Sequence, residues 1–176
     1  RANTAVGLGA LYANRTGSNN TAIGVRAMVN SQAASRNVAI GDSTLYSNTV
    51  NELVAIGHFA MRDNTTGVDN VAVGAFAMEA NTTGSENTAL GANALPVNTS
   101  GGFNTAVGAN TLYYQTAATG NTAIGSNTLP NITTGGYNTA LGINAMYNDT
   151  TGSLNVAIGH WALFQNRNGN NNIAIG

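Results

Sequence analysis

The sequence predicts an all-β protein, a parallel β-solenoid of ten coils with about 17 residues each. The first observation is the tripeptide Ala-(Val/Ile/Leu)-Gly, which recurs from Ala5-Val6-Gly7 to Ala174-Ile175-Gly176 every 17 residues, with one spacing of 16. The second is a Leu or Met four residues after each Gly that opens a unit. The third is a turn-forming Asn-Thr-Thr-Gly segment, present at 64–67 and 81–84 and with small changes in several other units. Units this short cannot hold two packed helices, which need more than ~30 residues. Residues 1–176 therefore form a single repeat domain, a fragment of a longer fibre or a filament subunit.

Each unit begins with a short strand that runs from Asn to the anchor Gly, as in 20–24 and 87–91. These segments alternate β-branched residues and are bounded by turn residues, which is typical of strands. We expect a tight turn next, then a second short strand around an Ala-Leu pair such as 94–95, then the longer turn, where Asn and Gly tolerate positive φ. The missing residue falls within 48–53, in this longer turn, where a deletion does not reverse the strand faces.

Stacked coils place equal repeat positions on top of one another at about 4.8 Å. We expect the core to consist of two columns of apolar side chains. The first column is the aliphatic residue before each Gly, namely Val6, Ile23, Ile40, Ile56, Val73, Leu90, Val107, Ile124, Leu141 and Ile158. The second is Leu11, Met28, Leu45, Met61, Met78, Leu95, Leu112, Leu129, Met146 and Leu163.

The other face of each strand carries Ala and Gly instead of the long polar side chains of a solvated face. Such a strip allows another backbone to approach closely, which predicts a subunit interface; the alternative is that small residues fit a narrow coil. The strip is Ala22, Ala39, Ala55, Ala72, Ala89, Ala106, Ala123, Ala140 and Ala157.

The segment Asn-Thr-Ala-Ile-Gly-x-x-Ala at Asn20–Ala27, with a close copy at Asn87–Ala94, resembles the head repeat of trimeric autotransporter adhesins, the YadA-like head. The same repeat type occurs in bacteriophage tail-fibre proteins. The resemblance implies a left-handed parallel β-roll, a homotrimer, and an extracellular place on a bacterial cell surface or a virion tail. The unit is longer here than is usual in that family, and the extra residues lie in the Asn-Thr-Thr-Gly turn.

The composition narrows the classes of function. Charged residues make up 7% of the chain, the net charge is −1, and there is no cysteine. Nucleic-acid and polybasic membrane binders need clustered Lys and Arg, and no apolar run approaches the ~18 residues of a membrane span. The 2 His and 7 acidic residues are scattered and show no catalytic or metal-ligand spacing. We therefore expect no enzyme, no cofactor and no metal site.

The pattern favours a structural or adhesive segment of a surface fibre, with multivalent attachment to a host glycan or protein. One alternative is a homopolymeric extracellular filament, with copies stacked end to end. Another is an ice- or mineral-binding solenoid, for which a Thr column in the long turn, such as Thr65, Thr82 and Thr99, is the candidate surface.

Aromatic side chains at outward positions are the candidate ligand contacts, with packing across the surface as the alternative. They follow the anchor Gly or the Leu/Met column: His58, Phe59, Phe76, His160, Trp161, Tyr113 and Tyr147. The repeat itself generates Asn-x-Ser/Thr sequons, for example at Asn64, Asn81 and Asn98, so their presence does not by itself indicate glycosylation.

Overall fold

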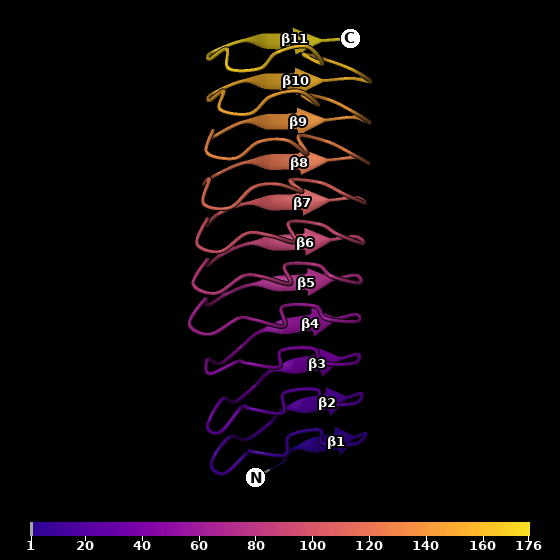
Figure 1. Cartoon of the computed structure of the whole chain (residues 1–176), viewed down its shortest axis with the longest axis vertical. Helices are drawn as coiled ribbons and strands as arrows, with labels where there is room; N and C mark the ends of the chain where they lie inside the picture. The colour runs from indigo at the N-terminus through magenta and orange to yellow at the C-terminus, as the bar shows by residue number, and fades with distance from the viewer. Residues whose placement is uncertain (1) are drawn as a thin grey trace.

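The computed structural model describes residues 2–176 as a single stack of coils in which each coil contributes one strand (Figure 1). These residues contain no helix. The strands have three residues each: β1 Thr4–Val6, β2 Thr21–Ile23, β3 Val38–Ile40, β4 Val54–Ile56, β5 Val71–Val73, β6 Thr88–Leu90, β7 Thr105–Val107, β8 Thr122–Ile124, β9 Thr139–Leu141, β10 Val156–Ile158 and β11 Ile173–Ile175. The predicted parallel β-solenoid is confirmed.

The strands form one parallel sheet in chain order from β1 to β11, so each strand pairs with its copy in the next coil. Equal repeat positions face each other, as in Ala72 with Ala89. The register is kept at the short unit, where Ala39 pairs with Ala55. The missing residue therefore lies in the turn, as predicted. In this turn Val50 O accepts the hydrogen bond from the Asn48 side-chain amide, which in other coils goes to the carbonyl oxygen of the turn Gly.

The expected second strand around the Ala-Leu pair is absent from residues 2–176, and turns take its place. Asn93 and Leu95 adopt left-handed backbone, with φ of 52° and 54°. Each such residue costs about 1–2 kcal/mol, and hydrogen bonds between coils offset part of this cost. The Leu95 N–H donates to Thr111 O at 2.9 Å, and the Asn93 N–H donates to Ala75 O at 2.9 Å.

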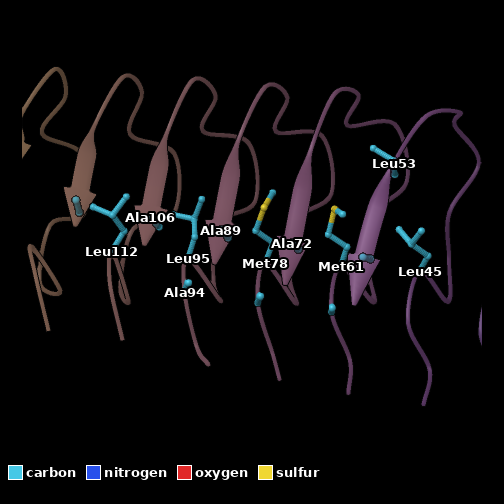
Figure 2. Packing of buried hydrophobic residues seen from close by; sticks show 14 of the residues in the cluster. Leu45, Leu53, Met61, Ala72, Met78, Ala89, Ala94, Leu95, Ala106 and Leu112 are labelled. Carbon is cyan, nitrogen blue, oxygen red and sulfur yellow. The ribbon is translucent and has the colours of Figure 1, made fainter. Parts of the chain in front are cut away.

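The core lies between the middle residue of each strand and the Leu/Met column (Figure 2). The second predicted column is confirmed: it is buried from Leu11 to Met146, and Leu163 is half-buried. The strand Ala residues face it and are buried from β2 to β10, as Ala72 and Ala89 show with 0% exposure, whereas Ala5 and Ala174 in the terminal strands are exposed and half-buried.

Two predictions about the strand faces are wrong. The aliphatic column from Val6 to Ile158 is not core: Val6 is 57% exposed and Leu141 is 43% exposed. The Ala strip from Ala22 to Ala157 is not open to another subunit, because it is buried inside the coil. The physical reason is the small cross-section, since opposite the Leu/Met column there is room for a methyl group only, and the longer aliphatic side chains point outward.

Buried asparagines form a second, polar part of the interior. Asn87 Oδ1 accepts the backbone N–H and the side-chain amide of Asn104, at 2.9 and 3.0 Å, and the same pattern links most neighbouring coils. A second column runs through the long turns, where the Asn81 amide donates to Asn64 Oδ1 at 2.9 Å. Within residues 2–176 every buried side-chain nitrogen and oxygen has a hydrogen-bond partner, as stable interiors require.

The anchor Gly is required by geometry at every coil. Gly91 has a φ of 139°, and a Cβ there would lie 2.6 Å from Gly108 O in the next coil. Neither the backbone angle nor the space admits a side chain. This constraint fixes how closely successive coils stack, and hence where every outward side chain lies.

Candidate functional site

The outward face of the sheet carries exposed and half-exposed aliphatic side chains along its whole length. The first and third residues of each strand point away from the core and line up in two columns, with an aliphatic residue in every coil. Phe103, Tyr137 and Leu154 stand beside these columns and are 60%, 65% and 56% exposed. Sequence reasoning placed the aliphatic residues inside and so missed this surface.

His58, Phe59 and Phe76 come together near β4 and β5, as their repeat positions predict. The rings of His58 and Phe59 stack with centroids 3.9 Å apart, and Phe76 meets both edge-on at 5.3 and 5.8 Å. Arg62 lies over the Phe59 ring at 5.0 Å. Because these rings cover one another and carry a cation, the arrangement favours mutual packing over an open stacking surface.

Arg62 is held by two carboxylates, Asp63 at 2.8 Å and Glu79 at 2.7 Å. The hydrogen bonds that Arg62 donates to Asp63 raise the pKa of the Arg62 guanidinium, and the charges of Asp63 and Glu79 add to the effect, against the opposing effect of burial. The two acids are therefore committed to an ion pair. In the described part of the chain no three His or acidic side chains gather as metal ligands would.

The second group of aromatic rings lies near the C-terminal coils. His160 stacks on Trp161 at 4.6 Å, Trp161 meets Phe164 at 5.8 Å, and Phe164 stacks on Tyr147 at 5.4 Å. The structure thus joins three of the predicted residues through Phe164, which sequence reasoning did not select. Phe164 occupies the same repeat position as Tyr113 and Tyr147, and that equivalence is the signal that could have found it.

A shallow groove of about 290 Å³ lies between Tyr113 and Tyr147. Pro130 occupies the tyrosine position in the coil between them, and it is buried. The groove is lined by Asn93, Asn110, Tyr113, Tyr114, Asn127, Pro130, Asn131 and Tyr147. Tyr114 meets Tyr113 edge-on at 4.8 Å. A neighbouring groove contains Arg167 and shares Tyr114 and Asn131 with it.

Neither the Thr column nor the sequons at Asn64, Asn81 and Asn98 present free groups. The Thr65 and Thr82 hydroxyls donate to backbone carbonyls of the next coil, each at 2.9 Å. Asn64, Asn81 and Asn98 are fully buried, so their amides are inaccessible to a glycosylating enzyme in the folded chain.

Asp149 is the one acid in the second asparagine column. Burial raises the pKa of this carboxyl, although hydrogen bonds from the Gly152 N–H and the Asn166 amide oppose the shift. The coil below it has Ile132 at the same position. An Asn at 149 would lack an amide oxygen beneath it, but its amide could donate to Gly152 O, as the Asn98 amide donates to Gly101 O. This buried carboxyl is therefore a structural member of the column.

Residues 2–176 include no helix of the length and apolarity that a membrane span requires. No protein-family model, curated protein or solved structure matches the chain.

Proposed function

We propose that the chain is a rigid segment of an extracellular or virion-surface fibre, in which copies pack through the outward sheet face and present other side chains for multivalent attachment. The observation that carries this proposal is the continuous exposed aliphatic surface on a rod of uniform register. The resemblance to adhesin heads and tail fibres supports three parallel copies.

The size of the outward face supports self-association. Ten steps of about 4.8 Å between eleven strands, by about 10 Å of strand length, give an outward strip of about 480 Å². Its column of third strand residues is aliphatic throughout, and its column of first strand residues consists of Thr, Val and Ile. This area lies within the ~300–600 Å² of the largest patch on a typical monomeric protein, and such patches are often functional. Phe103, Tyr137 and Leu154 widen the strip further. A covered strip of this kind would bring each copy towards the ~800 Å² that a stable interface buries per partner.

The charges beside the strip support a parallel arrangement in register. Charged side chains lie beside the column of first strand residues in the early coils, where Arg36 pairs with Glu52 at 2.6 Å. Asp69 and Glu86 follow at the same repeat position, and Phe103 occupies it in the next coil. Parallel copies would place apolar coils against apolar coils and would confine the acids of all copies to one end of the assembly. Antiparallel copies would place Phe103 and its successors against the acids, which disfavours that arrangement because charged groups would lose water without partners.

The mass in solution tests the proposal. We expect a trimer of about three times 17.8 kDa by light scattering coupled to size exclusion. Ile124→Glu, on the outward face at 38% exposure, should convert it to monomer with unchanged circular dichroism, because the new charge points to solvent in a single copy. Thr83→Glu, on an exposed turn away from the sheet, is the control and should keep the assembly. A monomer at every concentration would contradict the proposal.

A second function, binding to ice or an ordered mineral surface, is favoured by one observation. Thr88, Thr105, Thr122 and Thr139 form an outward column on four consecutive strands at strand spacing. Thermal hysteresis of the wild type, abolished by Thr105→Lys, would support this function, and no hysteresis at high protein concentration would remove it.

A further inference from the structure

We propose that the groove between Tyr113 and Tyr147 binds a neutral oligosaccharide, with a sugar ring stacked on Tyr147 and its hydroxyls hydrogen-bonded to the Asn93–Asn110–Asn127 column. This inference names a ligand class for the attachment role proposed above and rests on that role. The site lies on the turns, away from the outward sheet face, so that assembly would leave it open.

Tyr147 is a held aromatic platform with one face towards the groove. Phe164 in the next coil stacks on it at 5.4 Å with an interplanar angle of 19°, which covers one face of the ring. In the preceding coil the same position is Pro130, which is buried and too short to cover the opposite face. A fixed ring with an apolar face and a polar hydroxyl at its edge suits the mixed apolar and polar surface of a sugar.

The gap is produced by an alternation along one repeat position, which reads Pro96, Tyr113, Pro130 and Tyr147 in four successive coils. The two tyrosines therefore stand two coils apart, about 9.6 Å at the spacing of parallel strands. Two tyrosines in adjacent coils would stack on each other and close the space. The proline between them keeps it open and provides its floor.

The column of Asn93, Asn110 and Asn127 supplies both hydrogen-bond donors and hydrogen-bond acceptors. The Asn93 amide donates to Asn110 Oδ1 at 3.3 Å, and the Asn110 amide donates to Asn127 Oδ1 at 3.2 Å. Each of these amide groups has two N–H donors, of which the column uses one. The column thus leaves N–H groups and the Asn93 carbonyl oxygen for a ligand. Asn131, on the other side, donates to Tyr147 O at 2.7 Å and keeps its own oxygen as an acceptor.

The lining selects for a neutral ligand. The eight residues around the groove are Asn, Tyr and Pro, all uncharged, while the nearest cation among the lining residues of the adjacent groove is Arg167. An acidic sugar would lose water without gaining a counter-charge. Carboxamides, which both donate and accept, match hydroxyl groups. The volume lies at the lower end of the ~300–1,000 Å³ of ligand pockets, which fits one or two sugar rings.

Saturation-transfer NMR and calorimetry with a panel of neutral di- and trisaccharides, built from glucose, galactose, mannose or N-acetylglucosamine, test the site. A matched acidic panel contains sialic or uronic acid. We expect saturable binding of at least one neutral saccharide, with saturation transfer to ring C–H protons. Tyr147→Ala and Asn110→Ala should each weaken it about tenfold, which corresponds to roughly 1.4 kcal/mol.

Two further variants test whether binding depends on the gap and on the position of Tyr147. Pro130→Tyr should abolish binding by filling the gap with a side chain that the fold already accepts at this repeat position. Tyr12→Ala, the equivalent tyrosine in the first coil at 84% exposure, should leave binding unchanged. The inference is overturned if no neutral saccharide binds saturably, if acidic saccharides bind instead, or if Tyr12→Ala weakens binding as much as Tyr147→Ala.

The mass of each sample separates this inference from the proposed function. Tyr147→Ala and Pro130→Tyr leave the outward sheet face intact, so their assembly state should equal that of the wild type. An intact trimer without saccharide binding overturns the site and leaves the fibre assembly standing. A monomer that binds saccharide through Tyr147 overturns the assembly and supports the site.

Discussion

Replacing Asn87 by Ala should show how much the first asparagine column contributes to stability. Asn87 is fully buried and takes part in four side-chain hydrogen bonds. Its amide donates to Asn70 Oδ1 at 3.2 Å and to Gly101 O at 2.9 Å. Its oxygen accepts the Asn104 backbone N–H at 2.9 Å and the Asn104 amide at 3.0 Å.

The magnitude depends on which partners remain satisfied in the variant. Asn70 Oδ1 still accepts the backbone N–H of residue 87, and Gly101 O still accepts the Asn98 amide. Two buried donors lose their acceptor: the Asn104 backbone N–H and one N–H of its amide. At about 1–3 kcal/mol for each buried unsatisfied group, Asn87→Ala should destabilise the chain by about 2–6 kcal/mol.

Urea unfolding followed by far-ultraviolet circular dichroism measures this loss. The control is Asn30→Ala, an exposed turn residue, which should change stability by no more than about 0.5 kcal/mol. Asn87→Leu, which copies the natural Leu53 at the same repeat position, fills the space but orphans the same donors. It should fall between wild type and Asn87→Ala. A loss below about 0.5 kcal/mol for Asn87→Ala would refute the assignment of stability to this column.

Three further variants test the coil interior. Gly91→Ala should prevent native folding, because its Cβ would lie 2.6 Å from a carbonyl oxygen, and the loss of β-type circular dichroism would show this. Gly9→Ala, where the nearest atoms are 3.9 Å away, is the control and should fold. Met78→Ala should cost about 2–5 kcal/mol in urea unfolding by opening a cavity in the buried column, and an unchanged midpoint would contradict the core assignment. Because burial raises the pKa of Asp149 above its ordinary value of 3.8, its contribution to stability is full below that pH and is lost as the pH rises through the raised pKa. Asp149→Asn should therefore raise the urea midpoint at pH 7 and flatten this part of the pH profile; a lower midpoint at pH 7 would contradict the sign.

The repeat period was sufficient to predict the sheet, its register and the place of the missing residue. Because the spacing holds over the whole chain, stacked coils pair equal repeat positions with one another. Ala39 lies opposite Ala55, so the shorter unit does not disturb this register. The second strand could not be predicted in this way. Leu95 adopts left-handed backbone for which its residue type gives no local signal, and Phe59 and Phe76 do the same at the repeat position where Asn93 stands; bonds to the neighbouring coils hold these residues there.

The strand faces were assigned wrongly because hydrophobicity was weighed above size. Val6 and Ile23 are more apolar than Ala5 and Ala22, so the usual preference places them inside. In a coil this narrow the interior is limited by volume, and the Leu/Met column already fills it. The signal that gives the correct answer is uniformity: the inward positions hold Ala in every coil, while the outward ones vary among Val, Ile, Leu and Thr.

The same contrast indicates where function should be sought. Inward positions repeat because each coil meets the same steric and hydrogen-bonding demands, so they carry no information about a ligand. Outward positions are free of those demands, and it is there that the coils differ: Arg62 with its acids lies near β4 and β5, and the Pro130 gap lies between Tyr113 and Tyr147. Pro130 leaves a gap between two tyrosines at a repeat position that also holds Val29, Arg62, Glu79 and Pro96, so the stack does not require a proline there. We attribute the gap to a ligand and not to a demand of the fold. Pro130→Tyr separates the two explanations, because filling the gap should preserve the fold and remove saccharide binding.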